Sequence, residues 1–575
     1  MDARRSPVPV RWGVLLATGA TLAALGTATA GPATASAGTA PATHANRPLA
    51  ASASSGGGWS DGLWGDPLTD LLFGTSYGTV AAQQDAGSLY NVERSIGVRS
   101  IWNSRDAGWR NVTGQGVGVA LLDSGVAEVP GLDAPGKVTH GPDLSIEGNG
   151  VLTDQDTYGH GTFMAGIIAG RGTTGPSALL PLAAPNVQLG VAPDAKLLSM
   201  KLATTDGSTD VSQVIAALDW VTQHPVLPDG TRVRVVNLSY GTESAQGYQL
   251  DPLAAAAENA WRHGIVVVTS AGNTGTEDGR LTDPAIDPYV LAVGAAASND
   301  QLDGWTHSQT AVADFSAVGD GVRNPDLIAP GTSIVSLRAP GSYIDVNHPE
   351  GLVTGDTSGR LFRGSGTSQA TAVVTGVVAD LLQAYPNLTP DQVKYALVAS
   401  AQQVRGSTAA ASGAGIVNAA GALEIAGRLA GGWGASALRA AAVQSFPQSA
   451  GQGSIDAARG GAVLVDPDGN DLSGEIDVQG MPWDPEAWYQ ASSTLTAWSG
   501  GSWLGTVWTG DGWDPSTGQY DSARWSSARW SSARWSSARW SSARWSSARW
   551  SSARWSSARW SSARWSSARW SSADW

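Results

Sequence analysis

Short apolar runs alternate with longer amphipathic segments through the middle of the chain. The runs are rich in β-branched residues, which is typical of strands buried on both faces; they cover residues 116–122, 196–202, 232–239, 264–270 and 289–296. Helical patterns lie between and after them, at residues 211–224, 253–264, 371–385 and 389–401. In the last of these, Thr389 and Pro390 form a standard helix start. The alternation predicts an α/β fold with a parallel β-sheet flanked by helices on both faces.

The 575 residues are too many for one compact domain, and the pattern divides them. Residues 90–430 carry the strands and helices and form the predicted main domain. Residues 38–89 are rich in Ala, Ser and Gly, which indicates a loose leader. The Gly-rich stretch AGGWGAS opens residues 431–521, which we expect to be a linker and a Trp-containing β-rich or irregular region.

Residues 1–37 have the layout of a secretory signal peptide. Arginines at 4, 5 and 11 precede an apolar core, and small-residue sites follow at 28–30 and 35–37. A membrane anchor is the alternative, but the core is short and rich in glycine and alanine. Twin-arginine export fits poorly with the residues after Arg5. No second long apolar stretch follows, so we expect a secreted, extracellular protein without a transmembrane span in its mature form.

Residues 522–575 repeat the pentapeptide WSSAR. A step of five sends successive tryptophans to opposite faces of a strand and rotates them by about 140° in a helix, so neither structure gains a Trp stripe. The repeats hold ten arginines and one aspartate, a charge of +9, whereas the whole chain carries −14. Arg beside Trp suits anionic polymers and sugar rings. We expect cell-wall or surface-polymer attachment, with a β-helix and disorder as alternatives.

Tryptophans also follow a five-residue grid before the repeat, as if older copies had decayed; they stand at 483, 488, 498, 503, 508 and 513.

Composition adds two exclusions. The chain has no cysteine, so it has neither disulfides nor thiolate metal sites. The net charge of −14 gives no indication of nucleic-acid binding by the body of the protein.

Two polar residues stand in glycine-containing turns beside predicted elements. Asp123 follows the first predicted strand, at the sheet edge where sites assemble in parallel sheets. The alternative is that it only opens the Asp-Ser-Gly turn. His160 lies between two glycines, which suggests a backbone that comes close to another group. A packing or surface role is the alternative for this histidine.

Two more polar residues occupy similar positions. Asn273 follows the strand at 264–270, either as a functional amide or as a turn residue that tolerates left-handed geometry. Ser368 lies in GSGTSQA, at the start of the apolar helix. Helix starts favour developing negative charge, although a serine there is commonly an N-cap.

Together the stretches DSG, HGT and GTSQA resemble the subtilisin-like serine proteases (subtilases), whose catalytic order is Asp, His, Ser. The stretches VNLSYGT, DPYVLAVGA and PDLIAPGTSIVS also fit this family. The resemblance covers about residues 90–430, and it implies that this domain is a subtilisin-like peptidase domain.

The resemblance implies a secreted serine endopeptidase that acts on proteins or peptides through an acyl-enzyme intermediate. Ser368 would be the nucleophile, His160 the general base and Asp123 the residue that orients it. Asn273 would donate to the oxyanion. An extended substrate would add as a strand at residues 239–241; the substrate-binding residues implied are Ser239, Tyr240, Gly241, Ala271 and Gly272. The chemistry needs no cofactor. Calcium often stabilises members of this family, so the resemblance allows a structural calcium ion, but its ligands cannot be mapped onto this chain and we assign no metal residues.

The sequence departs from the common family pattern at a few places. Phe163 stands where many relatives have a second histidine, and Gln369 and Ala372 stand where many have Met and Pro. The leader is also short for an inhibitory propeptide. A binding or structural protein built on an inactive protease body is the competing hypothesis, and the intact triad argues against it.

Overall fold

The computed structural model describes residues 77–104, 109, 111–147, 152–173, 175–297, 310–432, 434–460, 464, 471–508, 513–514, 519–520 and 564–565. The predicted signal peptide, most of the predicted leader and nearly all of the pentapeptide tail lie outside these residues. Among the residues described, no helix is both long enough and apolar enough to cross a membrane.

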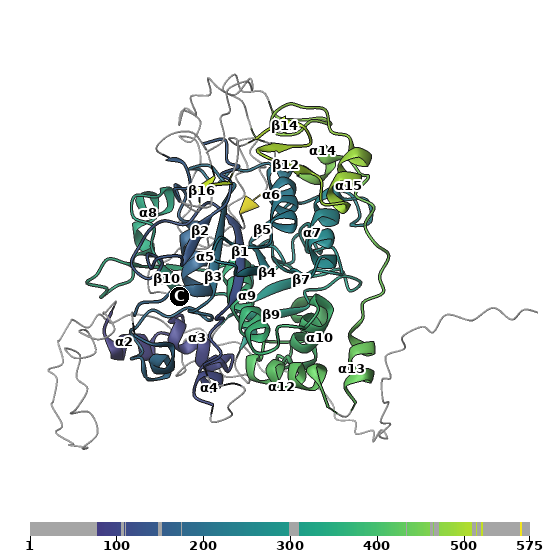
Figure 1. Ribbon diagram of the computed structural model, residues 1–575. Coiled ribbons are helices and arrows are strands. Elements are labelled where there is room, and N and C mark those ends of the chain that lie inside the picture. The colour runs from purple at the N-terminus through teal and green to yellow at the C-terminus, as the bar shows by residue number, and fades with distance from the viewer. Residues whose placement is uncertain are drawn as a thin grey trace, which may run out of the picture. The chain divides into compact units, whose positions relative to one another are not determined.

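A mainly parallel β-sheet forms the centre of the fold (Figure 1). Its strand order is β2-β3-β1-β4-β6-β7-β8, with β9 also paired to β7. All of these pairs are parallel except β7–β8. The strands are β1 (Val117–Asp123), β2 (Val138–His140), β3 (Lys196–Lys201), β4 (Arg232–Leu238), β6 (Val266–Ser270), β7 (Leu291–Ala297), β8 (Ala311–Val312) and β9 (Leu327–Pro330). The predicted α/β class is confirmed.

The strands that follow the apolar runs are covered on both faces. Every residue of β1 and of β6 is buried, which is why both strands begin with apolar runs that do not alternate with polar residues; the polar residues stand at their carboxyl ends. Helices provide the cover. The long helix α9 (Thr367–Ala384) packs across β1, β4, β6, β7 and β9 and against α5 (His160–Ala169). The helices α6 (Val211–Gln223) and α7 (Pro252–Arg262) pack on each other and on β1 and β6.

Side-chain caps fix where several helices begin. Asp210 and Gln213 form a reciprocal capping box at the start of α6. Thr389 and Gln392 do the same for α10 (Pro390–Ser400), with Pro390 in the first turn, as the sequence predicts. The helix α12 (Ala419–Ala430) then packs on α10 and ends the predicted main domain.

The N-terminal residues described include part of the predicted leader. Helices α2 (Thr79–Gln84), α3 (Leu89–Ser95) and α4 (Val98–Trp102) lie in this region. Tyr77 and Ala82 belong to the hydrophobic core. Asp85 pairs with Arg363, with N–O distances of 2.5 and 3.0 Å. Residues 77–89 therefore pack as part of the main domain.

The remaining short elements before residue 430 are η2 (Ser177–Leu182), β5 (Tyr240–Gly241), β10 (Ile334–Leu337), α8 (Tyr343–Asn347), η3 (Pro349–Gly351), β11 (Leu361–Gly364) and α11 (Ala409–Ser412).

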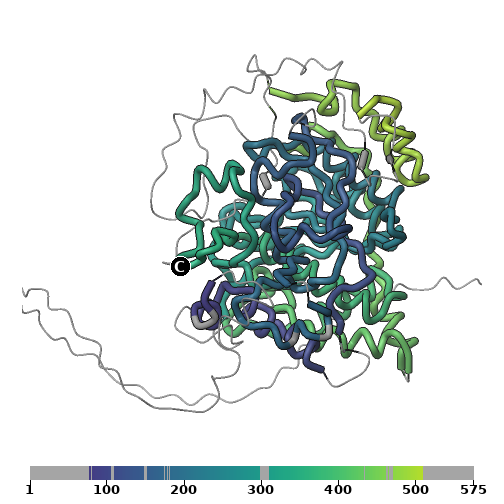
Figure 2. The backbone as a smooth tube through the Cα atoms, turned by 60° about the vertical axis from the view of Figure 1, so that its left-hand side comes forward, coloured from purple at the N-terminus to yellow at the C-terminus, as the bar shows by residue number. Residues whose placement is uncertain are grey.

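The segment after residue 430 is folded against helices of the main domain: its first helix packs on α10 and α12, and later elements pack on α6 and α7. It contains α13 (Ala435–Ala442), α14 (Ile455–Arg459), α15 (Pro485–Ser493) and the antiparallel strands β12 (Trp498–Ser499), β13 (Ser502–Trp503) and β14 (Thr506–Val507). Figures 1 and 2 both show α15 beside α7. The two-residue strands β15 (Trp513–Asp514) and β16 (Gln519–Tyr520) pair with each other, and β17 (Arg564–Trp565) pairs with β5.

Tryptophans of the five-residue grid anchor this C-terminal segment. Trp488 and Trp503 are fully buried, and their indole Nε1 atoms donate to Asp219 of α6 at 3.0 and 2.9 Å. The Ser492 hydroxyl donates to the same carboxylate at 2.5 Å. Trp498 donates to the Ala216 carbonyl at 2.8 Å. We refer to residues 444–508 as the C-terminal clamp, because they bind along α6 and α7.

Candidate active site

The carboxyl ends of the parallel strands gather most of the residues that the sequence singles out. Asp123 is the last residue of β1, next to Lys201 at the end of β3. Ser239 directly follows β4, and Asn273 lies in the loop after β6. Parallel strands end at a common edge, so these positions converge although they are far apart in the sequence.

Asp123 and His160 form a buried pair at this edge. The Nδ1 atom of His160 lies 2.8 Å from Asp123 Oδ1 and 3.0 Å from Oδ2. Both side chains are at most 1% exposed. The Ser124 amide also donates to Asp123 Oδ1, at 2.8 Å, and this contact fixes the carboxylate. A carboxylate in this place selects the imidazole tautomer with its proton on Nδ1.

The glycines around His160 are required by close packing. Gly159 is the N-cap of α5 and has φ 106°, a left-handed conformation that side chains rarely adopt. A Cβ on Gly161 would lie 2.0 Å from the Gly125 carbonyl oxygen. The sequence-based expectation of a closely approaching backbone is therefore correct at Gly161, and α5 can present His160 in its first turn.

A second aspartate, which the sequence analysis misses, holds this turn in place. Asp156 accepts from the Thr162 amide at 2.7 Å and from the Thr162 hydroxyl at 2.5 Å. Its other oxygen accepts from the Gly159 amide at 2.7 Å and from Ser124 Oγ at 2.8 Å. Burial raises the pKa of Asp156, and the bonds from Thr162 oppose that shift. Its only sequence signal is its place in the turn four residues before His160.

Ser368 is the second residue of α9, and it is buried. The N-cap of this helix is Gly366, which has no side chain, so the alternative reading of Ser368 as an N-cap is wrong. The backbone N–H of Ser368 is in the first turn, where the N–H groups point out of the helix end. Its carbonyl oxygen accepts from Ser239 Oγ at 3.3 Å, which ties the nucleophile turn to the strand edge. Helix α9 packs against α5, which carries His160.

Asn273 is bound to the same turn. Its Oδ1 accepts from the Thr367 amide at 2.8 Å and from the Thr367 hydroxyl at 2.9 Å. These contacts identify Oδ1 as the acceptor end of the amide, so Nδ2 is the end that can donate. Gly272 before it has φ 111°, and Ala271 is fully buried beside it. The loop after β6 is thus tied through Asn273 Oδ1 to Thr367, the residue before Ser368.

The expected substrate edge is the short strand β5, which contains Tyr240 and Gly241. The tail strand β17 pairs with it in antiparallel register, Arg564 opposite Gly241. The Tyr240 side chain is fully buried, and burial, with the nearby carboxylates of Asp210 and Asp283, raises the pKa of its phenol well above the usual value. Tyr240 therefore contributes its backbone to this edge, and its ring packs into the protein.

The residues that depart from the family pattern are also buried. Phe163 packs in the core, and its carbonyl accepts from Ser336 Oγ at 2.7 Å. Gln369 is fully buried directly after Ser368, and neither of its amide atoms has a hydrogen-bond partner among the residues described. Within the same residues, no group of three or more His, Asp or Glu side chains is arranged to hold a metal ion.

Comparison with known proteins agrees with this geometry. The Subtilase family matches residues 114–422, which is more than half of the chain. Serine protease AprX of Bacillus subtilis (strain 168) is 33% identical over 315 residues, which cover 54% of this chain and 66% of AprX. Subtilisin Savinase of Lederbergia lenta is 31% identical over 310 residues, which cover 54% of this chain and 91% of that protein. The match thus spans just under two thirds of AprX.

Among solved structures, fervidolysin from Fervidobacterium pennivorans is similar over 59% of this chain and 47% of its own, with 26% identity and a TM-score of 0.44. Its title describes a keratinolytic enzyme related to subtilisin. The family match contains Asp123, His160, Asn273 and Ser368 in one continuous stretch. The chain belongs to the subtilase family.

Proposed function

We propose that the protein is a serine endopeptidase that hydrolyses peptide bonds through Asp123, His160 and Ser368. The observation that carries this proposal is the buried hydrogen bond between Asp123 and His160 Nδ1, at 2.8 Å. With its proton on Nδ1, the imidazole has Nε2 as its basic nitrogen. A serine hydroxyl is a weak nucleophile until such a base is beside it. Ser368 lies in the first turn of α9, and α9 packs against α5, the helix that carries His160.

The reaction then follows from the roles of these atoms. Ser368 Oγ attacks the scissile carbonyl carbon while its proton passes to His160 Nε2. The negative oxygen that forms is stabilised by Asn273 Nδ2 and the Ser368 backbone N–H. His160 returns the proton to the leaving amine, the C–N bond breaks, and an acyl-enzyme remains. Water then attacks the ester carbonyl while His160 takes its proton; the bond to Ser368 Oγ breaks, the carboxylic acid product leaves, and His160 returns the proton to Oγ. Asp123 stabilises the imidazolium in both steps.

The substrate in this proposal is an extended protein or peptide segment. The backbone of Tyr240 and Gly241 would pair with it as an added strand, and Ser239, Ala271 and Gly272 would surround the residue before the scissile bond. Two observations support this assignment. Ser239 is bonded to the Ser368 carbonyl, and β5 accepts an antiparallel strand along its edge.

The decisive experiment is substitution of the nucleophile. Ser368→Ala is expected to abolish hydrolysis of an unstructured protein and covalent labelling by a serine-directed organophosphate. Ser400→Ala is the matched control, because Ser400 lies on α10 and its hydroxyl bonds, among the contacts described, only to the carbonyls of Leu397 and Asn418. Hydrolysis and labelling that persist in Ser368→Ala would show that this serine is not the nucleophile.

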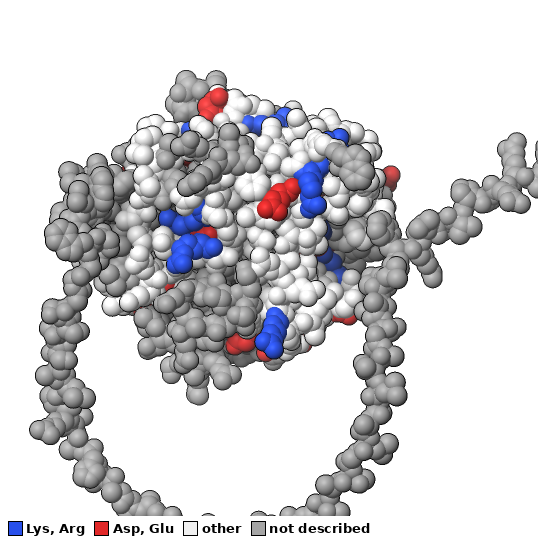
Figure 3. All heavy atoms as spheres, turned by 90° about the horizontal axis from the view of Figure 1, so that it is seen from below, with Lys and Arg blue, Asp and Glu red and all other residues white. Residues whose placement is uncertain are grey.

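We also propose that the protein is secreted and that its tail binds a cell wall or an anionic surface polymer. The signal layout of residues 1–37 and the +9 charge of residues 522–575 support this proposal. The body differs from the tail in charge: in the view of Figure 3, basic and acidic side chains are interspersed on the visible face. N-terminal sequencing and the intact mass of the secreted protein would test the processing.

The tail experiment should compare the full chain with a chain that ends after residue 508. A cut near residue 430 is unsuitable, because it would also remove the tryptophans that bind along α6. The full chain should sediment with isolated cell walls and the shortened chain should not. Equal binding by the two chains would contradict the attachment role.

A further inference from the structure

The C-terminal clamp contacts two chain segments near the proposed catalytic residues. One is the chain around β5, which follows Ser239, whose hydroxyl bonds to the Ser368 carbonyl. The other is the loop of residues 202–209, which follows β3 at the same sheet edge as Asp123 and is followed by Asp210. In this loop, a Cβ on Gly207 would lie 2.8 Å from the ring of Tyr158, two residues before His160. Both segments therefore lie close to the catalytic turns.

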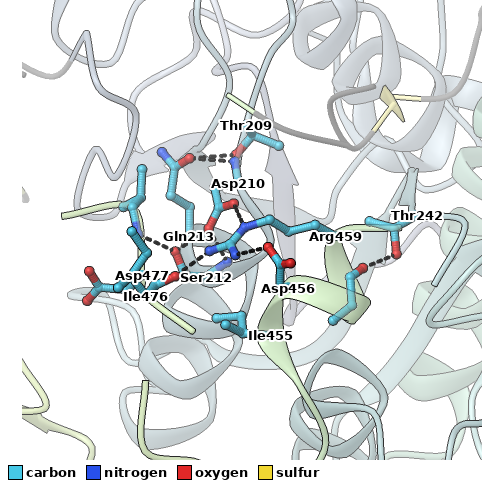
Figure 4. A network of polar contacts seen from close by, with 12 residues as sticks. Thr209, Asp210, Ser212, Gln213, Thr242, Ile455, Asp456, Arg459, Ile476 and Asp477 are labelled. Carbon is cyan, nitrogen blue, oxygen red and sulfur yellow. Dashed lines mark hydrogen bonds and ion pairs between the residues drawn. The ribbon is translucent and has the colours of Figure 1, made fainter. Parts of the chain in front are cut away.

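Arg459, the last residue of α14, connects the clamp to the loop. Its Nε lies 2.7 Å from Asp210 Oδ2, and both side chains are at most 1% exposed. The other guanidinium nitrogens bond to Asp456 at 3.2 Å, to the Gly474 carbonyl at 2.9 Å and to the Ile476 carbonyl. Figure 4 shows the guanidinium between Asp210 and the clamp. A planar group with five donors holds all these acceptors at once, which a lysine cannot do.

Asp210 in turn bonds to the first residues of α6, next to the end of the loop. Its Oδ1 accepts from the Ser212 amide at 2.9 Å, and its own amide donates to Gln213 Oε1 at 2.7 Å. Thr209 donates to the same Gln213 oxygen at 3.2 Å. The clamp reaches this cap a second time, because the Val478 amide donates to Ser212 Oγ at 3.0 Å. The end of the loop is therefore fixed from two sides.

The same short helix also holds the chain after β5. Thr242 Oγ1 donates to the Ala458 carbonyl at 2.6 Å, one residue before Arg459. Gly460, one residue after it, packs so closely that a Cβ would lie 2.3 Å from the Glu243 carbonyl carbon. Figure 4 shows Thr242 on the opposite side of α14 from Asp210. The loop that ends before Asp210 and the chain after β5 are thus joined through three consecutive residues of the clamp.

We propose that Arg459 is a positioning residue for extended substrates, and that α14 sets the spacing between β5 and the loop of residues 202–209. A buried ion pair is weak support for stability but can specify geometry, which is the role assigned here. This inference rests on the proposed peptidase function. Hydrolysis of a substrate that pairs with β5 depends on the spacing between β5 and this loop. Hydrolysis of an ester of a single residue does not depend on it, because such an ester needs only the residues around Ser368.

Arg459→Lys tests the proposal in the full chain, because it keeps the charge and loses the fork of donors. For an extended peptide, we expect kcat/KM to fall about tenfold, mainly through KM, and the turnover of a single-residue ester to stay within about twofold. Thr242→Val keeps Arg459 and removes only the bond to Ala458. It should also lower kcat/KM for the peptide without lowering ester turnover, and it provides the test if Arg459→Lys fails to fold. Thermal unfolding verifies folding in each variant.

Asp219→Asn is the matched control, because it weakens the clamp at the Trp anchor and leaves Arg459 in place. It should lower stability and leave the ratio of peptide to ester turnover unchanged. The inference is overturned if Arg459→Lys and Thr242→Val lower peptide and ester turnover equally, or if Asp219→Asn changes the ratio as much as they do. A wild-type chain that neither hydrolyses the ester nor reacts with an organophosphate would refute the peptidase function itself.

Discussion

Asn273 is predicted to have two separable tasks, one at each end of its amide. Oδ1 holds the Thr367 amide and hydroxyl, at 2.8 and 2.9 Å, and Nδ2 is assigned to the oxyanion. Asn273→Ala removes both ends. Loss of an oxyanion donor of this kind lowers kcat by about 10²–10³, which is about 3–4 kcal/mol of transition-state stabilisation. Leaving the buried Thr367 donors without an acceptor should cost about 1–3 kcal/mol of folding stability in addition.

Asn273→Asp separates the two effects, because a carboxylate still accepts from Thr367 and cannot donate to an oxyanion. We expect kcat to fall at least as far as in Asn273→Ala, with a smaller loss of stability. Peptide hydrolysis measures the first quantity, and urea unfolding measures the second. The control is Asn418→Ala, which removes the N-cap of α12 and should cost about 1 kcal/mol of stability with kcat unchanged.

Two results would refute this reasoning. If Asn273→Asp keeps kcat within tenfold of the wild type, Nδ2 is not the oxyanion donor. If Asn273→Ala unfolds at the wild-type urea concentration, the amide does not support the turn of Thr367.

Three further predictions concern stability. Gln369→Met should raise the free energy of unfolding by about 1–3 kcal/mol, because it replaces a buried amide without described partners by an apolar chain of similar shape; an unchanged or lower value in urea unfolding would show that the amide is satisfied. Burial raises the pKa of Asp219 from 3.8 to about 6, so the folded chain binds a proton that the unfolded chain has lost. The contribution of Asp219 to the free energy of unfolding should fall by about 3 kcal/mol as the pH rises from about 4 to 7, and Asp219→Asn should lack this pH dependence; parallel stability–pH curves for the two proteins would contradict the assignment. A chain that ends at residue 443 should unfold at a much lower temperature than the full chain, whereas one that ends at residue 508 should match it, and calorimetry distinguishes the two; equal melting of all three chains would mean that the clamp adds no stability.

The sheet and the site motifs were accessible from the sequence for a physical reason. Strands buried on both faces are mostly apolar, so the runs at β1, β3, β4, β6 and β7 stand out without any partner being known. The turn glycines were equally informative, because the close approach of Gly161 to the Gly125 carbonyl leaves no room for a side chain. Asp156 gave no comparable signal, since an aspartate in a loop is ordinary until its four donors are known.

The docking of the C-terminal clamp could not be predicted from the sequence, because the residues that it contacts are distant along the chain. From the sequence, the tryptophans of the grid are interpreted only as decayed copies of the pentapeptide repeat, for which a step of five forms no stripe in a strand or a helix. In the structure the chain reverses between grid positions, so that Trp498 and Trp503 face each other as a cross-strand pair of β12 and β13. A two-residue strand followed by a tight turn accounts for the period. Docking on Asp219 depends on three-dimensional contacts that no local pattern contains.

The carboxylate of Asp219 has a consequence for protein engineering. It sits on a helix of the catalytic body, yet the three donors that satisfy it come from beyond the stretch matched by the family. A chimaera that grafts this body onto another subtilase without the clamp would expose the Asp219 carboxylate and an apolar helix surface to water. The smallest unit that can be exchanged between subtilases is therefore residue 219 and its surroundings together with the tryptophans of the clamp.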